Sequence, residues 1–311
     1  MKSSNIGGQA VLEGVMMKNG DEYAVAVRKP DGEIEVKKET YQSAIKWKAL
    51  TRIPFVRGVF NFIDSMVLGM KTLTYSASFY EDEEEEKGKV LTEEEAKKQE
   101  KKDSLLMTVT VAFSIVLAIG IFMVLPYYII SFAGGFIKSR ILLTALEGIL
   151  RLAIFIGYIL LISRMQDIRR VYMYHGAEHK CINCIENGLE LTVENVRKSS
   201  KQHKRCGTSF LLFVMLVSCV MVFFIHAESQ VVRVVLRIAL IPVIAGISYE
   251  LIKWAGNSEN PIINLLSKPG LWMQNLTTKE PDDDMIEVAI QSVEAVFDWK
   301  KYKEENFGAE V

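Results

Sequence analysis

The chain has 311 residues, of which 50% are apolar and 24% charged, and its mean hydropathy is +0.16. Charge is crowded into some stretches and nearly absent from others, which excludes an ordinary soluble globule. The net charge of −1 gives no basic field, so a nucleic-acid partner is not expected. The start, MKSSNIGGQA, has no charged region followed by an apolar one, so no cleaved signal peptide is expected.

The first 40 residues carry the signals of a small β-sheet. Residues 23–27 and 33–36 alternate apolar and polar side chains, and Pro30-Asp31-Gly32 between them is a turn signal, so a β-hairpin is predicted. The segment 10–17 is expected to join this hairpin in a cytoplasmic sheet. The paired glycines at 7–8 predict a backbone that turns sharply or passes close to another part of the chain.

Residues 59–77 place apolar side chains at helical spacing, interrupted by two charges. A fifth membrane span here would place the basic connection 163–207 outside, so an amphipathic helix at the membrane interface is expected instead. Residues 1–80 are therefore predicted to combine a β-hairpin module with this helix. The following segment, 81–103, is a charged, low-complexity linker that is expected to be solvated.

Residues 104–255 are predicted to form a four-span membrane domain. Four stretches are long and apolar enough to cross a bilayer: residues 105–132, 141–162, 208–225 and 231–252. The connection 163–207 carries nine Lys and Arg residues, whereas the two connections on the opposite side carry two and none. Both termini and the 163–207 connection are therefore expected in the cytoplasm.

Charged residues interrupt two of the expected spans. Glu147 and Arg151 are one helical turn apart and are expected to form a pair that faces other helices. Arg233 and Arg237 are expected to snorkel toward the outer interface. A proton or ion path through these charges would indicate a transporter, which is the third functional alternative.

The C-terminal segment, 256–311, is expected in the cytoplasm. Pro261 and Lys268-Pro269-Gly270 are expected to break the chain, and an amphipathic helix is predicted after Asp282-Asp283-Asp284. The fold class is therefore mainly α: a polytopic α-helical membrane protein with four spans and a small β-containing cytoplasmic module.

The chemistry-bearing residues converge on the connection 163–207, which holds three of the four histidines and three of the four cysteines. In a helix, His175-x-x-Glu178-His179 places two imidazoles and a carboxylate on one narrow face, because successive residues turn by about 100°. Such a pair of histidines can hold a metal ion, and the glutamate can accept a proton from water. The order matches the inverted zincin spacing. His175 and His179 are therefore predicted metal ligands, with Glu178 as general base.

A solvated helix face, with its histidines paired to nearby carboxylates, is the simpler alternative, and Gly176 disfavours a helix at this point. A catalytic site also needs a third ligand. Glu250 and His203 are the preferred candidates, and Glu250 is attractive because an acid at the boundary of a span is costly unless it is paired or bound to a metal. Cys206 and Glu13 are further candidates.

A rival interpretation is a closed structural zinc site. Cys181-x-x-Cys184, followed after 18 residues by His203-x-x-Cys206, resembles a zinc-ribbon spacing. Such a site would have four protein ligands and no open position for water or substrate, so it would not be catalytic.

Six motifs along the chain carry a family resemblance: GGQAVLEGVMM (7–17), YHGAEHKCIN (174–183), LTVENVR (191–197), HKRCGTSF (203–210), SYELIKW (248–254) and LTTKEPDDD (276–284). Over residues 5–300 the chain resembles the YqhQ-like family of bacterial membrane proteins, a family of unknown function described as predicted metal-dependent enzymes. The resemblance implies a metal site whose residues lie within these motifs. In that pattern Cys181 and Cys184 are incidental, which weakens the zinc-ribbon alternative.

The first functional hypothesis is a metal-dependent hydrolase at the cytoplasmic face of a bacterial plasma membrane. Its ion is expected to be divalent, and zinc in particular, because imidazole ligands suit zinc. The expected substrate is a peptide or a lipid-like ester. The alternative is a non-enzymatic scaffold or biogenesis factor for membrane proteins, with a structural metal or none. The lipid bilayer is the expected partner in both cases, together with other membrane proteins in the second.

Overall fold

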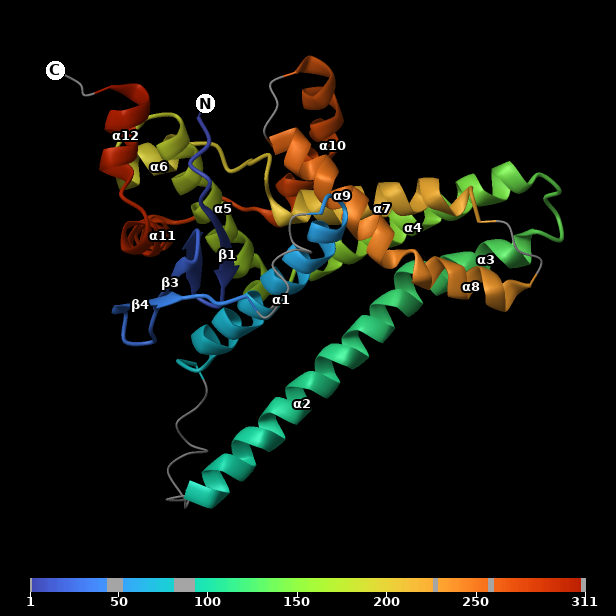
Figure 1. Ribbon diagram of the computed structural model, residues 1–311, viewed down its shortest axis with the longest axis horizontal. Coiled ribbons are helices and arrows are strands. Elements are labelled where there is room, and N and C mark those ends of the chain that lie inside the picture. The colour runs from blue at the N-terminus through green and yellow to red at the C-terminus, as the bar shows by residue number, and fades with distance from the viewer. Residues whose placement is uncertain (1, 44–52, 81–92, 226–228, 257–259, 309–311) are drawn as a thin grey trace. The chain divides into compact units, whose positions relative to one another are not determined.

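The computed structural model describes residues 2–43, 53–80, 93–225, 229–256 and 260–308 (Figure 1). The described chain is mostly helical with a small four-stranded antiparallel sheet, which confirms the fold class in this coarser form. The chain divides into two compact units. Unit 1 comprises Met1–Tyr80, Ile159–Val217 and Pro242–Val311, and unit 2 comprises Glu81–Tyr158 and Ser218–Ile241.

The sheet of unit 1 has the strand order β1-β2-β3-β4. Its strands are β1 (Gly7–Val11), β2 (Gly14–Asn19), β3 (Glu22–Arg28) and β4 (Ile34–Thr40). The predicted hairpin is β3–β4. The segment 10–17, however, is not one strand, because the chain turns at Leu12-Glu13 so that β1 pairs with β2. Gly14, the first residue of β2, allows the close pairing with β3, since a Cβ there would overlap the Ala26 carbonyl oxygen.

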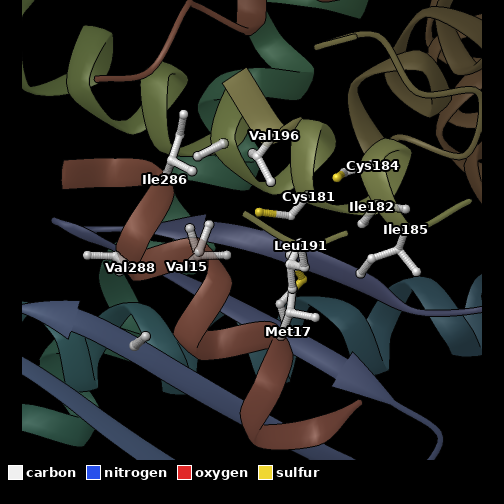
Figure 2. Packing of buried hydrophobic residues seen from close by; sticks show 14 of the residues in the cluster. Val15, Met17, Cys181, Ile182, Cys184, Ile185, Leu191, Val196, Ile286 and Val288 are labelled. Carbon is white, nitrogen blue, oxygen red and sulfur yellow. The ribbon is translucent and has the colours of Figure 1, made fainter. Parts of the chain in front are cut away.

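Side chains that alternate along the strands enter two different cores. On one face, β2 and β3 pack against α5 (Gln166–Glu186) and α11 (Asp283–Val296), where Val15 and Met17 meet Cys181, Ile182 and Ile286 (Figure 2). On the other face, α1 (Val56–Ala77) covers the sheet through Leu68. The period of two in the strands therefore fixes which helices lie on which face.

The remaining helices of unit 1 agree with one expectation and correct another. Most of the connection 163–207 is helical, in α5 and α6 (Val193–Lys198). The predicted break at Lys268-Pro269-Gly270 is wrong, because α10 (Pro261–Thr277) continues through Pro269. Helix α11 begins after Asp282, as predicted, and is followed by α12 (Trp299–Phe307).

Two continuous helical segments in the described chain are long and apolar enough to cross a membrane, Leu105–Ala133 and Arg140–Ile162. The first is built from α2 (Glu93–Ile119), a π-helical turn (Gly120–Val124) and α3 (Leu125–Ala133), and the second is α4. A third results if α8 (Gln230–Ala239) and α9 (Ile241–Gly256) are counted as one span. The expected span at 208–225 is α7 (Gly207–Val222), only 16 residues long. Residues 81–92 of the expected linker lie outside the described residues, and its remainder belongs to α2.

Unit 2 holds a buried charge cluster. The expected pair forms, with the Arg151 guanidinium donating to Glu147 Oε1 at 2.9 Å and to Ser218 Oγ at 2.9 Å. Arg237 does not snorkel. It is buried, donates to both oxygens of Glu147 at 2.6 and 2.9 Å, and stacks 4.3 Å from the centre of the Tyr127 ring. One carboxylate thus holds two guanidinium groups inside this unit.

Glu147→Gln is expected to lower the free energy of unfolding by about 3–5 kcal/mol, because it leaves two buried guanidinium groups without a counter-charge. Thermal unfolding of the detergent-purified protein, followed by circular dichroism, measures the loss. Glu304→Gln makes the same change at an exposed side chain and is expected to leave the midpoint unchanged. Equal midpoints for the two variants would contradict the assignment of Glu147 as the anchor of the cluster.

Candidate metal centre

Helix α5 carries the predicted motif, and Gly176 does not interrupt it. The rings of His175 and His179 lie with their centroids 4.4 Å apart, as the spacing of one turn predicts. Among the residues that the structure describes, one group of three has its metal-binding atoms within 4.8 Å of one another: His175, His179 and Cys206. The structure thus brings Cys206 to the third position.

Backbone carbonyls orient both imidazoles. His175 Nδ1 lies 3.0 Å from the Thr277 carbonyl oxygen, and His179 Nδ1 lies 2.6 Å from the Lys201 carbonyl oxygen. A carbonyl can only accept, so each Nδ1 carries a proton, and in the neutral form of each ring, the form that binds metal, the lone pair is on Nε2. Histidine ligands of metals are held in the same way, by a hydrogen bond from the other ring nitrogen.

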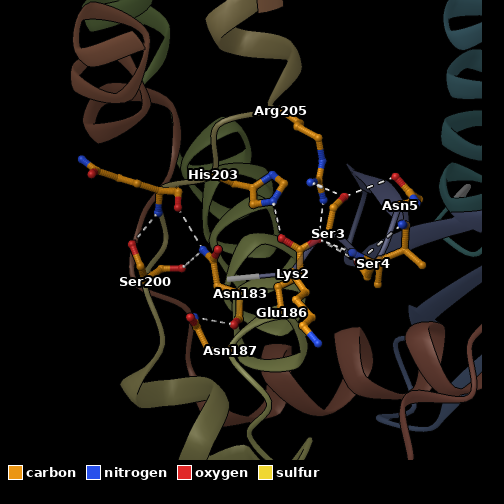
Figure 3. A network of polar contacts seen from close by, with 12 residues as sticks. Lys2, Ser3, Ser4, Asn5, Asn183, Glu186, Asn187, Ser200, His203 and Arg205 are labelled. Atoms are coloured by element: carbon orange, nitrogen blue, oxygen red, sulfur yellow. Dashed lines mark hydrogen bonds and ion pairs between the residues drawn. The ribbon is translucent and has the colours of Figure 1, made fainter. Parts of the chain in front are cut away.

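The 199–206 segment, which brings Cys206 to the site, is hydrogen-bonded along the side of α5 (Figure 3). Asn183 donates to the carbonyl oxygens of Ser200 and Gln202 at 2.6 and 2.9 Å. On the other side of the segment, the buried Gln274 of α10 accepts from the His203 amide at 2.8 Å and donates to the His203 carbonyl at 2.7 Å. The 199–206 segment is therefore fixed by hydrogen bonds of its backbone to two helices.

The surroundings of Cys206 favour its thiolate. Burial alone would raise the pKa of the thiol, but the two imidazoles outweigh burial and hold that pKa well below its usual range. His175 Nε2 lies 3.2 Å from the sulfur, and Thr208 contacts it through its hydroxyl at 3.1 Å and its amide at 3.4 Å. Burial would likewise lower the pKa of His175, but the neighbouring thiolate raises it to about 9. A thiolate is the form of cysteine that binds metal.

Glu178 lies beside the cluster without joining it. Its carboxylate is 3.9 Å from His175 Nε2, and it lines, with the three donors, a cavity of about 100 Å³. The same cavity is lined by Gly7 and Gly8 of β1. A side chain at Gly8 would come within 2.9 Å of Glu178 Cγ, which explains the close approach expected of the paired glycines.

His203 lines the cavity but faces another partner. Its Nε2 lies 3.6 Å from Glu186 Oε2 (Figure 3). Glu186 is fully buried and also accepts from Arg205 and from the amide and hydroxyl of Ser4, at 2.8 and 2.9 Å. Burial would raise the pKa of this carboxyl, but His203, Arg205 and Ser4 together lower it to about 2. His203 therefore belongs to the network that anchors the N-terminal segment to α5.

The structure does not bring Glu250 or Glu13 to the cluster. Glu250 of α9 forms a two-point ion pair with Arg57 of α1, at 2.6 and 2.5 Å. Glu13, in the turn between β1 and β2, pairs with Arg170 and accepts from the Tyr174 hydroxyl at 3.2 Å. Both acids have a basic partner, so neither offers a free carboxylate to an ion at the histidines.

The zinc-ribbon arrangement does not form either. Cys181 and Cys184 are buried in the apolar core between α5 and the sheet. Burial raises the pKa of both thiols, to about 11 in the case of Cys184, so both remain protonated. Cys206 contacts His175 instead of these two cysteines.

Comparisons with known proteins give a family but no activity. Residues 53–299 match the family model described as "Protein of unknown function (DUF1385)". A relative from Bacillus subtilis (strain 168), "Uncharacterized protein YqhQ", is 36% identical over 306 residues, covering 96% of this chain and 94% of the relative. No solved structure matches the chain.

Gly176→Ala is expected to destabilise the fold by about 1–3 kcal/mol, because the new Cβ would overlap the Lys279 carbonyl oxygen next to the Thr277–His175 contact. Thermal unfolding measures the effect. Gly157→Ala in α4 is the matched control, since its Cβ meets nothing within 4 Å and alanine is the better helix former. A Gly176→Ala protein as stable as the control would contradict this packing.

Proposed function

The chain belongs to the DUF1385 family of proteins of unknown function, and we propose from the geometry of its site that it is a metal-dependent hydrolase working at a membrane surface. One observation carries the proposal. Two imidazole nitrogens and one thiolate sulfur converge within 4.8 Å, both imidazoles are oriented by backbone carbonyls, and a carboxylate lines the same cavity.

The donor set fits zinc. Imidazole nitrogen and thiolate sulfur are preferred zinc ligands, and three protein ligands with one open position are typical of catalytic rather than structural zinc. A zinc ion in such a site supplies Lewis acidity and makes water nucleophilic near neutral pH. His175, His179 and Cys206 would hold the ion, and the 100 Å³ cavity beside them leaves room for water and a reacting group.

Glu178 is the proton carrier in this proposal. It lines the cavity with the three donors but lies outside the donor group. As general base it takes a proton from the attacking water, and as general acid it returns that proton to the leaving group. A peptide amide and a lipid-like ester are both substrates for this chemistry.

A membrane location is part of the proposal. The two long apolar segments, the α8–α9 pair and the shorter α7 support four spans, and the excess of Lys and Arg in 163–207 supports a cytoplasmic site with both termini on the same side. Helix α1 supports contact with the bilayer surface, because apolar side chains remain exposed on it. They are Phe62, Ile63, Met66, Val67 and Leu73.

Metal content tests the ligand set. Protein purified without chelator is expected to hold close to one zinc ion per chain by elemental mass spectrometry. Cys206→Ala and His175→Ala are each expected to lose it, because two remaining ligands hold zinc weakly. Glu250→Gln is the control that retains it, since Glu250 pairs with Arg57. A folded protein that contains no metal and takes none up on addition would overturn the proposal.

Glu178→Gln separates binding from catalysis. It is expected to keep zinc and the unfolding midpoint of the parent protein while turnover falls about 10²–10⁴-fold, the usual contribution of general acid–base catalysis. Because the substrate is unidentified, peptide termini and lipids are compared by mass spectrometry between cells making the parent protein and cells making the variant. Identical products in both would favour the scaffold function instead.

A further inference from the structure

The two edges of the sheet differ in character. The outer strand β4 (sequence IEVKKET) carries four charged side chains, which protect an edge from pairing with other chains. The opposite edge strand, β1 (sequence GGQAV), has no charge and no proline. Residues Gly8 to Ala10 are half-buried rather than covered. An edge without these protective features is suited to pairing with another strand.

Backbone groups of β1 point to that open edge. The two-residue turn at Leu12-Glu13 makes Val11 and Gly14 the closing hydrogen-bonded pair. The N–H and C=O groups of Gly8 and Ala10 therefore point away from β2, and within the described part of the chain they have no hydrogen-bond partner. The next amide along, of Leu12, donates to Ser76 Oγ at 3.1 Å. The open stretch thus lies between Ile6 and Leu12.

The open stretch adjoins the metal centre. Ser4 is bound to Glu186 near one end of α5 and Glu13 to Arg170 near the other, so β1 is held along the helix that carries the motif. Gly7 and Gly8 line the 100 Å³ cavity of the cluster and also a second cavity of about 840 Å³. That second cavity lies on the α1 face of the sheet, where Asn61, Asp64 and Tyr249 contribute to its wall.

We propose that the substrate is a peptide that binds in an extended conformation by adding a strand to the open edge of β1. This inference rests on the proposed function and names its substrate class. The Gly8 and Ala10 amides and carbonyls bond the peptide backbone, and the 840 Å³ cavity, within the usual size of ligand sites, receives its side chains. Strand addition to an edge is a general mode of peptide recognition.

The reaction is then the hydrolysis of one amide bond. Water adds to the carbonyl carbon of the bound peptide, the C–N bond breaks, and Glu178 moves the proton from the water to the departing amine nitrogen. The products are a carboxylate and an amine. A lipid-like ester has no amide backbone and gains nothing from the Gly8 and Ala10 groups, so edge pairing distinguishes the two substrate classes.

The test uses hydroxamates, which bind zinc, as probes of the zinc-loaded full-length protein. Isothermal titration calorimetry compares acetohydroxamic acid, acetyl-trialanine hydroxamate, the same peptide with N-methylated amides, and decanoyl hydroxamate. The trialanine probe is expected to bind at least about tenfold more tightly than acetohydroxamic acid. Each N-methylation that removes an edge hydrogen bond is expected to weaken it roughly fivefold.

A pair of variants tests the edge from the protein side. Ala10→Pro removes the outward N–H without removing a hydrogen bond to β2, and proline is tolerated at such edge positions. It is expected to lose about fivefold in affinity for the trialanine probe and nothing for acetohydroxamic acid. Ala10→Gly keeps the N–H and is expected to bind both as the parent does.

The outcomes separate this inference from the proposed function. If acetohydroxamic acid does not bind and the protein holds no zinc, the proposed function fails. If acetohydroxamic acid binds but the peptide adds no affinity, or N-methylation has no effect, the edge-pairing inference alone is overturned. A larger gain from decanoyl hydroxamate than from the peptide would assign the site to lipid-like esters. The N-methylated probe needs no variant, so the test stands if Ala10→Pro does not fold.

Discussion

The burial of a polar helix is the constraint on which unit 1 depends. Helix α5 is buried without interruption from Gly176 to Glu186, yet this stretch carries Glu, His, Lys and Asn side chains, each of which costs several kcal/mol inside a protein unless it is bonded. The 197–206 segment and the N-terminal residues supply most of those bonds. Lys180, for example, donates to the carbonyls of Arg197 and Ser199. The buried polar side chains of α5 need hydrogen-bond partners, and this requirement places the neighbouring segments around the histidines.

Three of the four glutamates near the site form ion pairs with arginines, and the fourth, Glu178, does not. Glu13, Glu186 and Glu250 each pair with an arginine, and a paired carboxylate holds two elements together but has no free charge for an ion. Glu178 has no arginine or lysine partner among the described residues, which leaves its carboxylate available in the cavity. The same residue type thus positions β1, the N-terminal segment and α1. Glu178, whose nearest basic group is His175 at 3.9 Å, is left for the proton transfer that we propose.

The sequence predicted the elements with local signals and missed those decided by packing. The turn at Pro30-Asp31-Gly32 and the start after Asp282 are encoded within a few residues, and both form. Proline and glycine at 269–270 predicted a break, yet α10 continues because Gln274 and Gly270 pack against the 203–209 segment. The third donor was left among four candidates, since nothing local distinguishes Cys206 from Glu250. The pairing of Glu250 with Arg57 is a contact over 193 residues, which no spacing reveals.

Two glycines, Gly8 of β1 and Gly176 of α5, allow the close contacts around the site. Gly8 lets β1 approach Glu178, and Gly176 lets the 277–281 segment approach closely enough for the Thr277 carbonyl to orient His175. A glycine inside a helix costs about 1 kcal/mol relative to alanine, so Gly176 appeared in the sequence as an argument against a helical motif. The structure reverses that argument: the missing side chain weakens the helix slightly but admits the carbonyl that fixes the imidazole. The absence of a side chain at Gly176 therefore both lowers the stability of the helix and makes room for the carbonyl that orients His175.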